Sequence, residues 1–204
     1  MSTNIPAAMV KELREATGAG VLDCRKALEQ TGGDMEKAAL ILREKGAVAA
    51  AKKAERVAEE GRIEGYIHPG NRVGVLLELN CESDFVARTA AFQELAHEIA
   101  LHVAFANPRW VKAEEVPASV VDAQKSEYRQ VAIAEGKNET VADRIVEGRL
   151  KKFYQDNCLM EQPYVRDDKI TIQQLVHTAV GQMGENIVVR RFIRYELGQE
   201  LEGD

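Results

Sequence analysis

The stretch RVGVLLELNCESDFVART, residues 72–89, decides the fold of the larger part of the chain. Its apolar first half predicts a strand, and the apolar spacing of the segment FQELAHEIALHVAF, residues 92–105, predicts a helix soon after it. Between them, Ser83 or Asp84 is suited to cap a helical turn. The turn carries Phe85, which is either a core ring or a side chain held out for a partner. By residue type alone, a core ring is the commoner outcome.

Working outward, the segment RIEGYIHPGNRVGVLLELN predicts an antiparallel hairpin whose turn lies at residues 68–71. A third, half-exposed strand is predicted in NIVVRRFIRYELG. Its alternation places Val189, Ile193, Tyr195 and Leu197 on one face and Arg190, Arg194 and Glu196 on the other. Helical patterns cover about 90–106, 119–134, 140–156 and 171–183. Residues 61–204 are therefore predicted to form an α+β domain, in which helices pack on a small three-stranded antiparallel sheet.

Residues 1–46 predict a compact module of three helices, with Asp34 capping the third helix and Gly46 stopping it. In the second helix, Val21 shares the core face with Cys24 and Leu28, whereas Leu22 lies about 100° away from that face. Residues 47–60 are rich in Ala, Lys and Glu, which is typical of a helical linker. A small module of this kind is better suited to binding than to catalysis.

The composition excludes several classes of protein. The chain has 204 residues, 45% of them hydrophobic, and its 27 Lys and Arg against 33 Asp and Glu leave a net charge of −6, which disfavours direct nucleic-acid binding. The stretch MSTNIPAAMVKELRE lacks the apolar core expected of a secretory signal, and no segment approaches the apolar run of about 20 residues needed to span a membrane. The chain is therefore expected to remain in the compartment in which it is made.

The three cysteines, Cys24, Cys81 and Cys158, are odd in number and form no CxxC motif, which fits reduced thiols in a cytoplasm. Each cysteine taken alone is commonly a small buried hydrophobic residue. Cys158 lies in the segment YQDNCLMEQP, which predicts a polar loop. Of the three, it is the one best placed to form a disulfide between the subunits of a symmetric dimer.

No enzymatic motif is present. His97 and His102 are five residues apart, so on a helix they diverge by about 140° and do not form the HExxH pair of a zinc protease. One is expected near the core and the other at the surface. No phosphate-binding GxxxxGK(S/T) loop and no GxSxG elbow occurs. We therefore predict that the chain is not an enzyme and that it uses neither a cofactor nor a metal.

Several long strings resemble the elongation factor Ts family. They include VKELREATGAGVLDCRKALEQTGGDMEKAALILREKG, RVGVLLELNCESDFVART, VADRIVEGRLKKFY, MEQPYV and FIRYELGQE, and together they cover almost the whole chain. The resemblance implies a guanine nucleotide exchange factor for the GTPase elongation factor Tu. The chain resembles the short form of the family, which forms homodimers, and it has no room for the second core copy or the protruding coiled-coil hairpin of long members.

The resemblance also implies which residues contact the GTPase. The core contact, which displaces Mg²⁺, falls on Ser83, Asp84, Phe85 and Val86. The contact region of the N-terminal module falls on Arg14, Val21 and Leu22, and His68 matches a further position. With the resemblance, Phe85 is expected to be a wedge rather than a core ring.

A different interpretation stays open for the N-terminal module. Three helices of this size also look like a ubiquitin-associated (UBA-like) domain, so the chain could be an interaction adaptor without exchange activity. The resemblance implies a bacterial-type cytoplasmic location, with an organelle stroma or matrix as the alternative.

Overall fold

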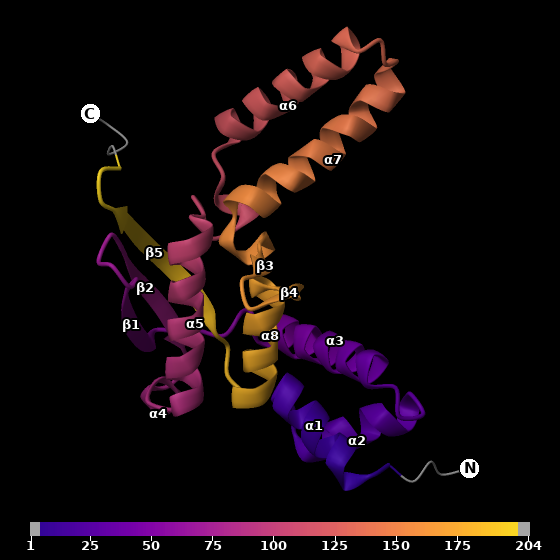
Figure 1. Ribbon diagram of the computed structural model, residues 1–204, viewed down its shortest axis with the longest axis vertical. Helices are drawn as coiled ribbons and strands as arrows, with labels where there is room; N and C mark the ends of the chain where they lie inside the picture. Colours follow the sequence, from indigo (N-terminus) through magenta and orange to yellow (C-terminus); the bar gives the residue numbers. More distant parts are fainter. Residues whose placement is uncertain (1–4, 200–204) are drawn as a thin grey trace.

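The computed structural model describes residues 5–199. Residues 1–4 of the predicted N-terminal module and residues 200–204 of the predicted α+β domain lie outside the described residues. Helices cover one face of a three-stranded antiparallel sheet, which confirms the predicted α+β fold. Buried apolar residues form two clusters, one among the N-terminal helices and one between the sheet and its helices. Figure 1 shows the N-terminal helices at one end of the molecule.

The N-terminal module comprises α1 (Ala7–Thr17), α2 (Val21–Gln30) and the first half of α3 (Met35–Lys53). Asp34 caps α3 as predicted, because its carboxylate accepts a hydrogen bond from the Lys37 N–H at 3.0 Å. Of the face predicted for α2, Cys24 and Leu28 are fully buried, but Val21 is 53% exposed. The prediction of Val21 as a core residue is wrong because Val21 is the first residue of its helix and lies at the edge of the module.

The predicted helix stop at Gly46 is also wrong. Helix α3 continues through Gly46 to Lys53, and its second half packs against α8 (Ile172–Met183). A β-carbon at Gly46 would lie 3.2 Å from the carbonyl oxygen of His177, so the missing side chain permits close helix packing here. The linker predicted at 47–60 is helical only as far as Lys53.

The sheet has the order β1 (Glu60–Ile67), β2 (Val73–Cys81) and β5 (Val188–Glu196), with both neighbouring pairs antiparallel. The predicted turn at residues 68–71 is confirmed by the hydrogen bond from the His68 N–H to the Val73 carbonyl at 2.9 Å. Helix α5 (Ala90–Ala106) covers the inner face of β1 and β2. A second, two-stranded sheet, β3 (Pro163–Tyr164) and β4 (Asp167–Thr171), was not predicted.

The predicted faces of the third strand are wrong because β5 contains a bulge. Leu79 pairs with Val189 and Glu78 pairs with Arg191, so Arg190 is left without a partner in the register. One extra residue reverses the alternation that follows it. Val189 is therefore buried, whereas Ile193 and Tyr195 lie on the opposite, outer face, and Arg194 points inward with its side chain only 9% exposed.

Helices α6 (Ala118–Ala134) and α7 (Glu139–Asn157) do not pack on the sheet, contrary to prediction. They form an antiparallel hairpin that projects from the core (Figure 1). Each helix buries only one residue, Ala132 or Ala142, so neither has an apolar face broad enough to cover a sheet. The prediction that the chain has no room for a protruding helical hairpin is wrong.

Cys158 follows α7 and is fully buried, so the prediction that it is well placed for a disulfide between subunits is wrong. The cysteine lies between α7 and the single-turn helix Leu159–Glu161, and its N–H donates to the Tyr154 carbonyl at 2.8 Å. Burial, reinforced by Glu161, raises the pKa of this thiol to about 11. A buried, protonated thiol is poorly placed for a disulfide between subunits, and Cys24 and Cys81 are also free and buried.

Candidate functional site

The corner between β2 and α5 is built from two consecutive helix caps. Ser83 is extended, and its hydroxyl accepts from the Val86 N–H at 3.4 Å, which starts the one-turn helix α4 (Asp84–Ala87). Thr89 then caps α5 by accepting from the Phe92 N–H at 3.2 Å, and its own hydroxyl donates to the Val86 carbonyl at 2.8 Å. The backbone of this corner is therefore held at both ends of α4.

Phe85 is 80% exposed and projects from this corner. Its neighbours face the other way, since Ala87 is buried and Val86 packs against the core cluster. Asp84 forms an ion pair with Arg88 at 2.8 Å across one helical turn. In the isolated chain, Phe85 therefore lies outside the core, and Val86 anchors the corner beneath it.

The N-terminal contact residues lie where α1 ends and α2 begins. Arg14 is exposed in the last turn of α1, and Leu22 is 73% exposed in the first turn of α2. Helix α1 ends at Gly18, whose backbone is left-handed (φ 63°), and a β-carbon there would collide with the amide of Gln182. The Gln182 amide donates to the Thr17 carbonyl at 2.9 Å, so the end of α8 holds this loop.

The C-terminal end of α8 also reaches the α4 corner, because Ser83 donates to Glu185, just beyond α8. Residues 182–185 therefore contact the α4 corner and the end of α1, which leads into the second predicted contact region. In Figure 1, α4, the end of α8 and the α1–α2 pair lie toward the same end of the molecule. The structure thus brings Phe85 and Leu22 to one end, although sequence separation alone does not require it.

His68 is not part of this assembly within one chain. It is exposed in the β1–β2 turn, where its Nδ1 lies 3.1 Å from the Tyr66 hydroxyl. The corner follows the other end of β2, a strand of nine residues that spans about 26 Å at its usual rise of about 3.3 Å per residue. His68 and Phe85 are therefore at opposite ends of the sheet.

The histidines of α5 are separated as predicted. His102 is 1% exposed, accepts from the Val165 N–H at 3.3 Å, and has its pKa lowered by burial. The His97 side chain is 49% exposed and contacts Glu64 at 3.2 Å. Across residues 5–199, no group of three or more His, Cys, Asp or Glu side chains is arranged to hold a metal ion. Within the same range, no helix has the length and apolar character needed to cross a membrane.

Comparison with known proteins identifies the class to which this fold and site belong. The family model described as Elongation factor TS matches residues 22–199. Elongation factor Ts of Thermoanaerobacter sp. (strain X514) is 53% identical over 198 residues, which is 97% of each chain. Those of Heliobacterium modesticaldum and Desulforamulus reducens are also 53% identical and are covered over 92% and 91% of their lengths.

The chain belongs to the elongation factor Ts family. This confirms the predicted role as a guanine nucleotide exchange factor for elongation factor Tu. The matched range includes Leu22, His68 and the α4 corner, whereas Arg14 and Val21 precede it. The relatives are about as long as this chain, which fits the short form.

Proposed function

We propose that this chain accelerates GDP release from elongation factor Tu by inserting Phe85 between helices of the GTPase near its Mg²⁺ site. Exchange of this kind requires that the factor bind the nucleotide-free GTPase more tightly than the nucleotide-bound form. The bound factor then lowers the affinity of the GTPase for nucleotide by the same factor by which bound nucleotide lowers its affinity for the exchange factor. A 10⁴-fold weakening corresponds to about 5.5 kcal/mol. The chain forms and breaks no covalent bond, so this function needs neither a catalytic residue nor a cofactor.

The observation that carries this proposal is the exposure of Phe85 on a rigid corner. Aromatic side chains that enter a partner's pocket contribute strongly to binding energy. The two caps order the backbone before binding, so little backbone entropy is lost when the complex forms. The side chain of Asp84 is 43% exposed and pairs with Arg88. Surface ion pairs contribute little stability, so this carboxylate can leave Arg88 and pair with a group of the GTPase.

Arg14, Val21 and Leu22 form the second contact in this proposal. Val21 and Leu22 expose apolar surface at 53% and 73%, and their module is joined to the core through α3 and through Gln182. A partner that spans both regions is bound by two contacts on one rigid support. The contribution of this region is to affinity, whereas Phe85 acts on the nucleotide site.

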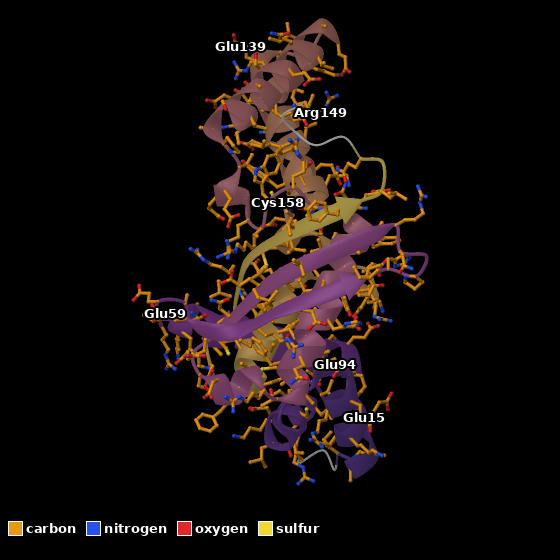
Figure 2. The ribbon with its side chains drawn as sticks, turned by 90° about the vertical axis from the view of Figure 1, so that its left-hand side faces the viewer. Glu15, Glu59, Glu94, Glu139, Arg149 and Cys158 are labelled. Carbon is orange, nitrogen blue, oxygen red and sulfur yellow. The ribbon has the colours of Figure 1, made fainter. Side chains whose placement is uncertain are left out.

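We also propose that two chains form a homodimer through the outer face of the sheet. Apolar side chains that are 46–64% exposed gather on this face, and they are Ile63, Ile67, Leu76, Ile193, Tyr195 and Leu197. Figure 2 looks onto this face, and no helix lies in front of the strands. A contiguous apolar patch of this kind is typical of an interface, and both β1 and β5 are edge strands.

Such a dimer gives His68 a role that one chain does not. Two sheets that pack face to face keep their strands roughly aligned. A two-fold axis perpendicular to the strands reverses their direction, so the β1–β2 turn of one protomer lies toward the end of the sheet from which its partner's α4 corner extends. One GTPase can then contact Phe85 of one protomer and His68 of the other.

We propose a division into an N-terminal module and a core whose boundary lies inside α3, after residue 45, because the second half of this helix packs with the core. The module has its own apolar cluster, which includes Val10, Leu13 and Leu28, but Ala50 in the second half of α3 belongs to the core cluster. Removal of residues 1–45 is therefore expected to leave a folded core that binds elongation factor Tu more weakly. Circular dichroism and titration against the GTPase measure both properties.

The cellular setting follows from the same proposal. Three free cysteines and bacterial relatives support action in a cytoplasm, where elongation factor Tu works, and the net charge of −6 supports a protein partner rather than direct contact with nucleic acid. The likeness of the N-terminal module to a ubiquitin-associated domain stays a prediction of fold.

The experiment is the release of fluorescently labelled GDP from purified elongation factor Tu, with excess unlabelled GDP and increasing amounts of this protein. We expect release to accelerate with concentration and to saturate. Heat-denatured protein is the control for nonspecific effects. An adaptor without exchange activity would leave the rate of GDP release unchanged, whether or not it binds the GTPase. An unchanged rate would therefore refute the proposal.

A further inference from the structure

The segment between α8 and β5 contacts the α4 corner through a single carboxylate. Oε2 of Glu185 accepts from the backbone N–H groups of Glu82 and Ser83 at 3.1 and 3.0 Å, and Oε1 accepts from the Ser83 hydroxyl at 2.6 Å. These three donors lie at the point where the chain leaves β2 and enters α4. One carboxylate, distant in sequence, therefore accepts hydrogen bonds from all three of these donors.

The next residue extends this connection to α3. Asn186 is 6% exposed; its N–H donates to the Glu82 carboxylate at 2.6 Å, and its side-chain amide donates to the Arg56 carbonyl at 2.8 Å. Arg56 lies in the segment that follows α3. Residues 185 and 186 together connect the α4 corner to the segment that follows α3, the helix shared with the N-terminal module.

The Glu185 contacts have a direct consequence for the cap of α4. Hydrogen bonds to an ionised carboxylate are stronger than those between neutral groups. Because the Ser83 hydroxyl donates its only hydrogen to Glu185, its lone pairs are left to accept from the Val86 N–H. That capping bond is long, at 3.4 Å, so the position of Ser83 depends heavily on Glu185.

Phe85 itself has few contacts that could orient it, since it is 80% exposed. The direction of its ring is therefore set by the backbone of α4, and what holds that backbone also holds the ring. We propose that Glu185 is a positioning residue for nucleotide exchange, which acts through Ser83 to hold Phe85 in the orientation needed to enter the GTPase. This inference rests on the proposed role of Phe85.

The test compares Glu185→Ala with the isosteric Glu185→Gln in the labelled GDP release assay. We expect Glu185→Ala to lower the saturating release rate about tenfold and to change the concentration for half-saturation less. Glu185→Gln should recover the rate to within about threefold, because its oxygen still accepts from the N–H groups and its amide can donate to Ser83. Glu147→Ala, an exposed glutamate on α7, is the matched control.

A double variant distinguishes positioning from a general structural role. If Glu185 acts only through Phe85, then Glu185→Ala should cause no further loss of release rate in the Phe85→Ala background. A full additional tenfold loss there, or a wild-type rate for Glu185→Ala alone, would overturn the proposal. A urea titration of each variant identifies any loss that results from unfolding.

Hydrogen exchange of the isolated protein provides a readout that does not depend on elongation factor Tu. In Glu185→Ala, the hydrogen-bonded amides of Glu82, Ser83 and Val86 should exchange at least tenfold faster, while those in the centre of α5 keep their wild-type rates. Unchanged exchange rates at these three amides would show that Glu185 does not hold the corner and would overturn the inference. If the wild-type protein fails to accelerate GDP release, the proposed function fails instead, and the two failures are thereby distinguished.

Discussion

Phe85 and Phe92 are seven residues apart and lie in opposite surroundings. Phe85 is 80% exposed, whereas Phe92 is fully buried between α5 and the sheet. The difference arises from helix length and capping, because α4 stops after one turn and Thr89 starts a new helix in a new direction. The comparison teaches that the residue proposed to act on the partner and the residue that stabilises the fold are adjacent but separate, so mutation can separate their effects.

The largest effect is expected for Phe92→Ala. Truncation of a fully buried ring removes its apolar contacts and leaves a cavity, which typically costs about 3–5 kcal/mol. The free energy of unfolding, measured by urea titration, should fall by that amount. If Phe92→Ala were as stable as the wild type, the contrast between the two rings would not hold.

The outer sheet face provides a third environment, exposed in one chain but proposed to be covered in the dimer. We expect Ile193→Lys to weaken the dimer at least 100-fold, which corresponds to about 2.7 kcal/mol, because a charge then faces an apolar partner surface. Light scattering over a range of concentrations measures the mass in solution. This mass should fall from twice the chain mass of 22.6 kDa in the wild type toward the mass of one chain in the variant.

The matched control for the dimer is Leu40→Lys, which replaces a 50% exposed apolar residue on α3, away from the sheet. It should leave the dimer intact. A wild-type protein that is monomeric at every concentration and still exchanges nucleotide at the full rate would refute the dimer but would leave the proposed role of Phe85 unaffected.

Phe85→Ala should show the complementary pattern to Phe92→Ala. We expect the stimulated GDP release rate to fall at least tenfold, a change of about 1.4 kcal/mol, because the aromatic contact with the GTPase is lost. The free energy of unfolding should change by less than about 0.5 kcal/mol, since an exposed side chain contributes little to the core. A large loss of stability with a normal release rate would reverse the assignment of the two rings.

The smallest effect is expected on adding a reductant, because the three cysteines are already free thiols. With a pKa raised to about 11, the Cys158 thiol is almost entirely protonated at pH 8, and its thiolate fraction increases only as the pH rises toward 11. Native protein at pH 8 should therefore incorporate almost no iodoacetamide at Cys158, as judged by mass spectrometry. Light scattering should give the same mass with and without reductant, and a dimer that dissociates on reduction would contradict this prediction.

The parts of the fold that were predicted correctly depend on local patterns. The turn at 68–71, the cap at Asp34 and the helix at 90–106 follow from turn chemistry, capping and apolar spacing over short stretches. The errors at Gly46 and in β5 have a different cause. Whether a glycine stops a helix depends on what packs against it, and a one-residue bulge reverses a strand without changing its composition.

The candidate site shows the same division. The stretch 80–89 and its resemblance to a family were sufficient to select Phe85 and its neighbours, but Glu185 was not predicted, because no local motif links it to Ser83. A glutamate three residues before a strand is an ordinary surface residue by sequence. Its three hydrogen bonds to the corner exist only because α8 ends beside α4.

The sequence by itself determined the α+β class, most of the helices, the three antiparallel strands and membership of the family, because these depend on periodicity and on long matching strings. Only the tertiary structure decided that Val21 is exposed, that Cys158 is buried, and that α6 and α7 project as a hairpin. The physical reason is that exposure is a property of what packs against a residue, and the packing partners here are distant in sequence.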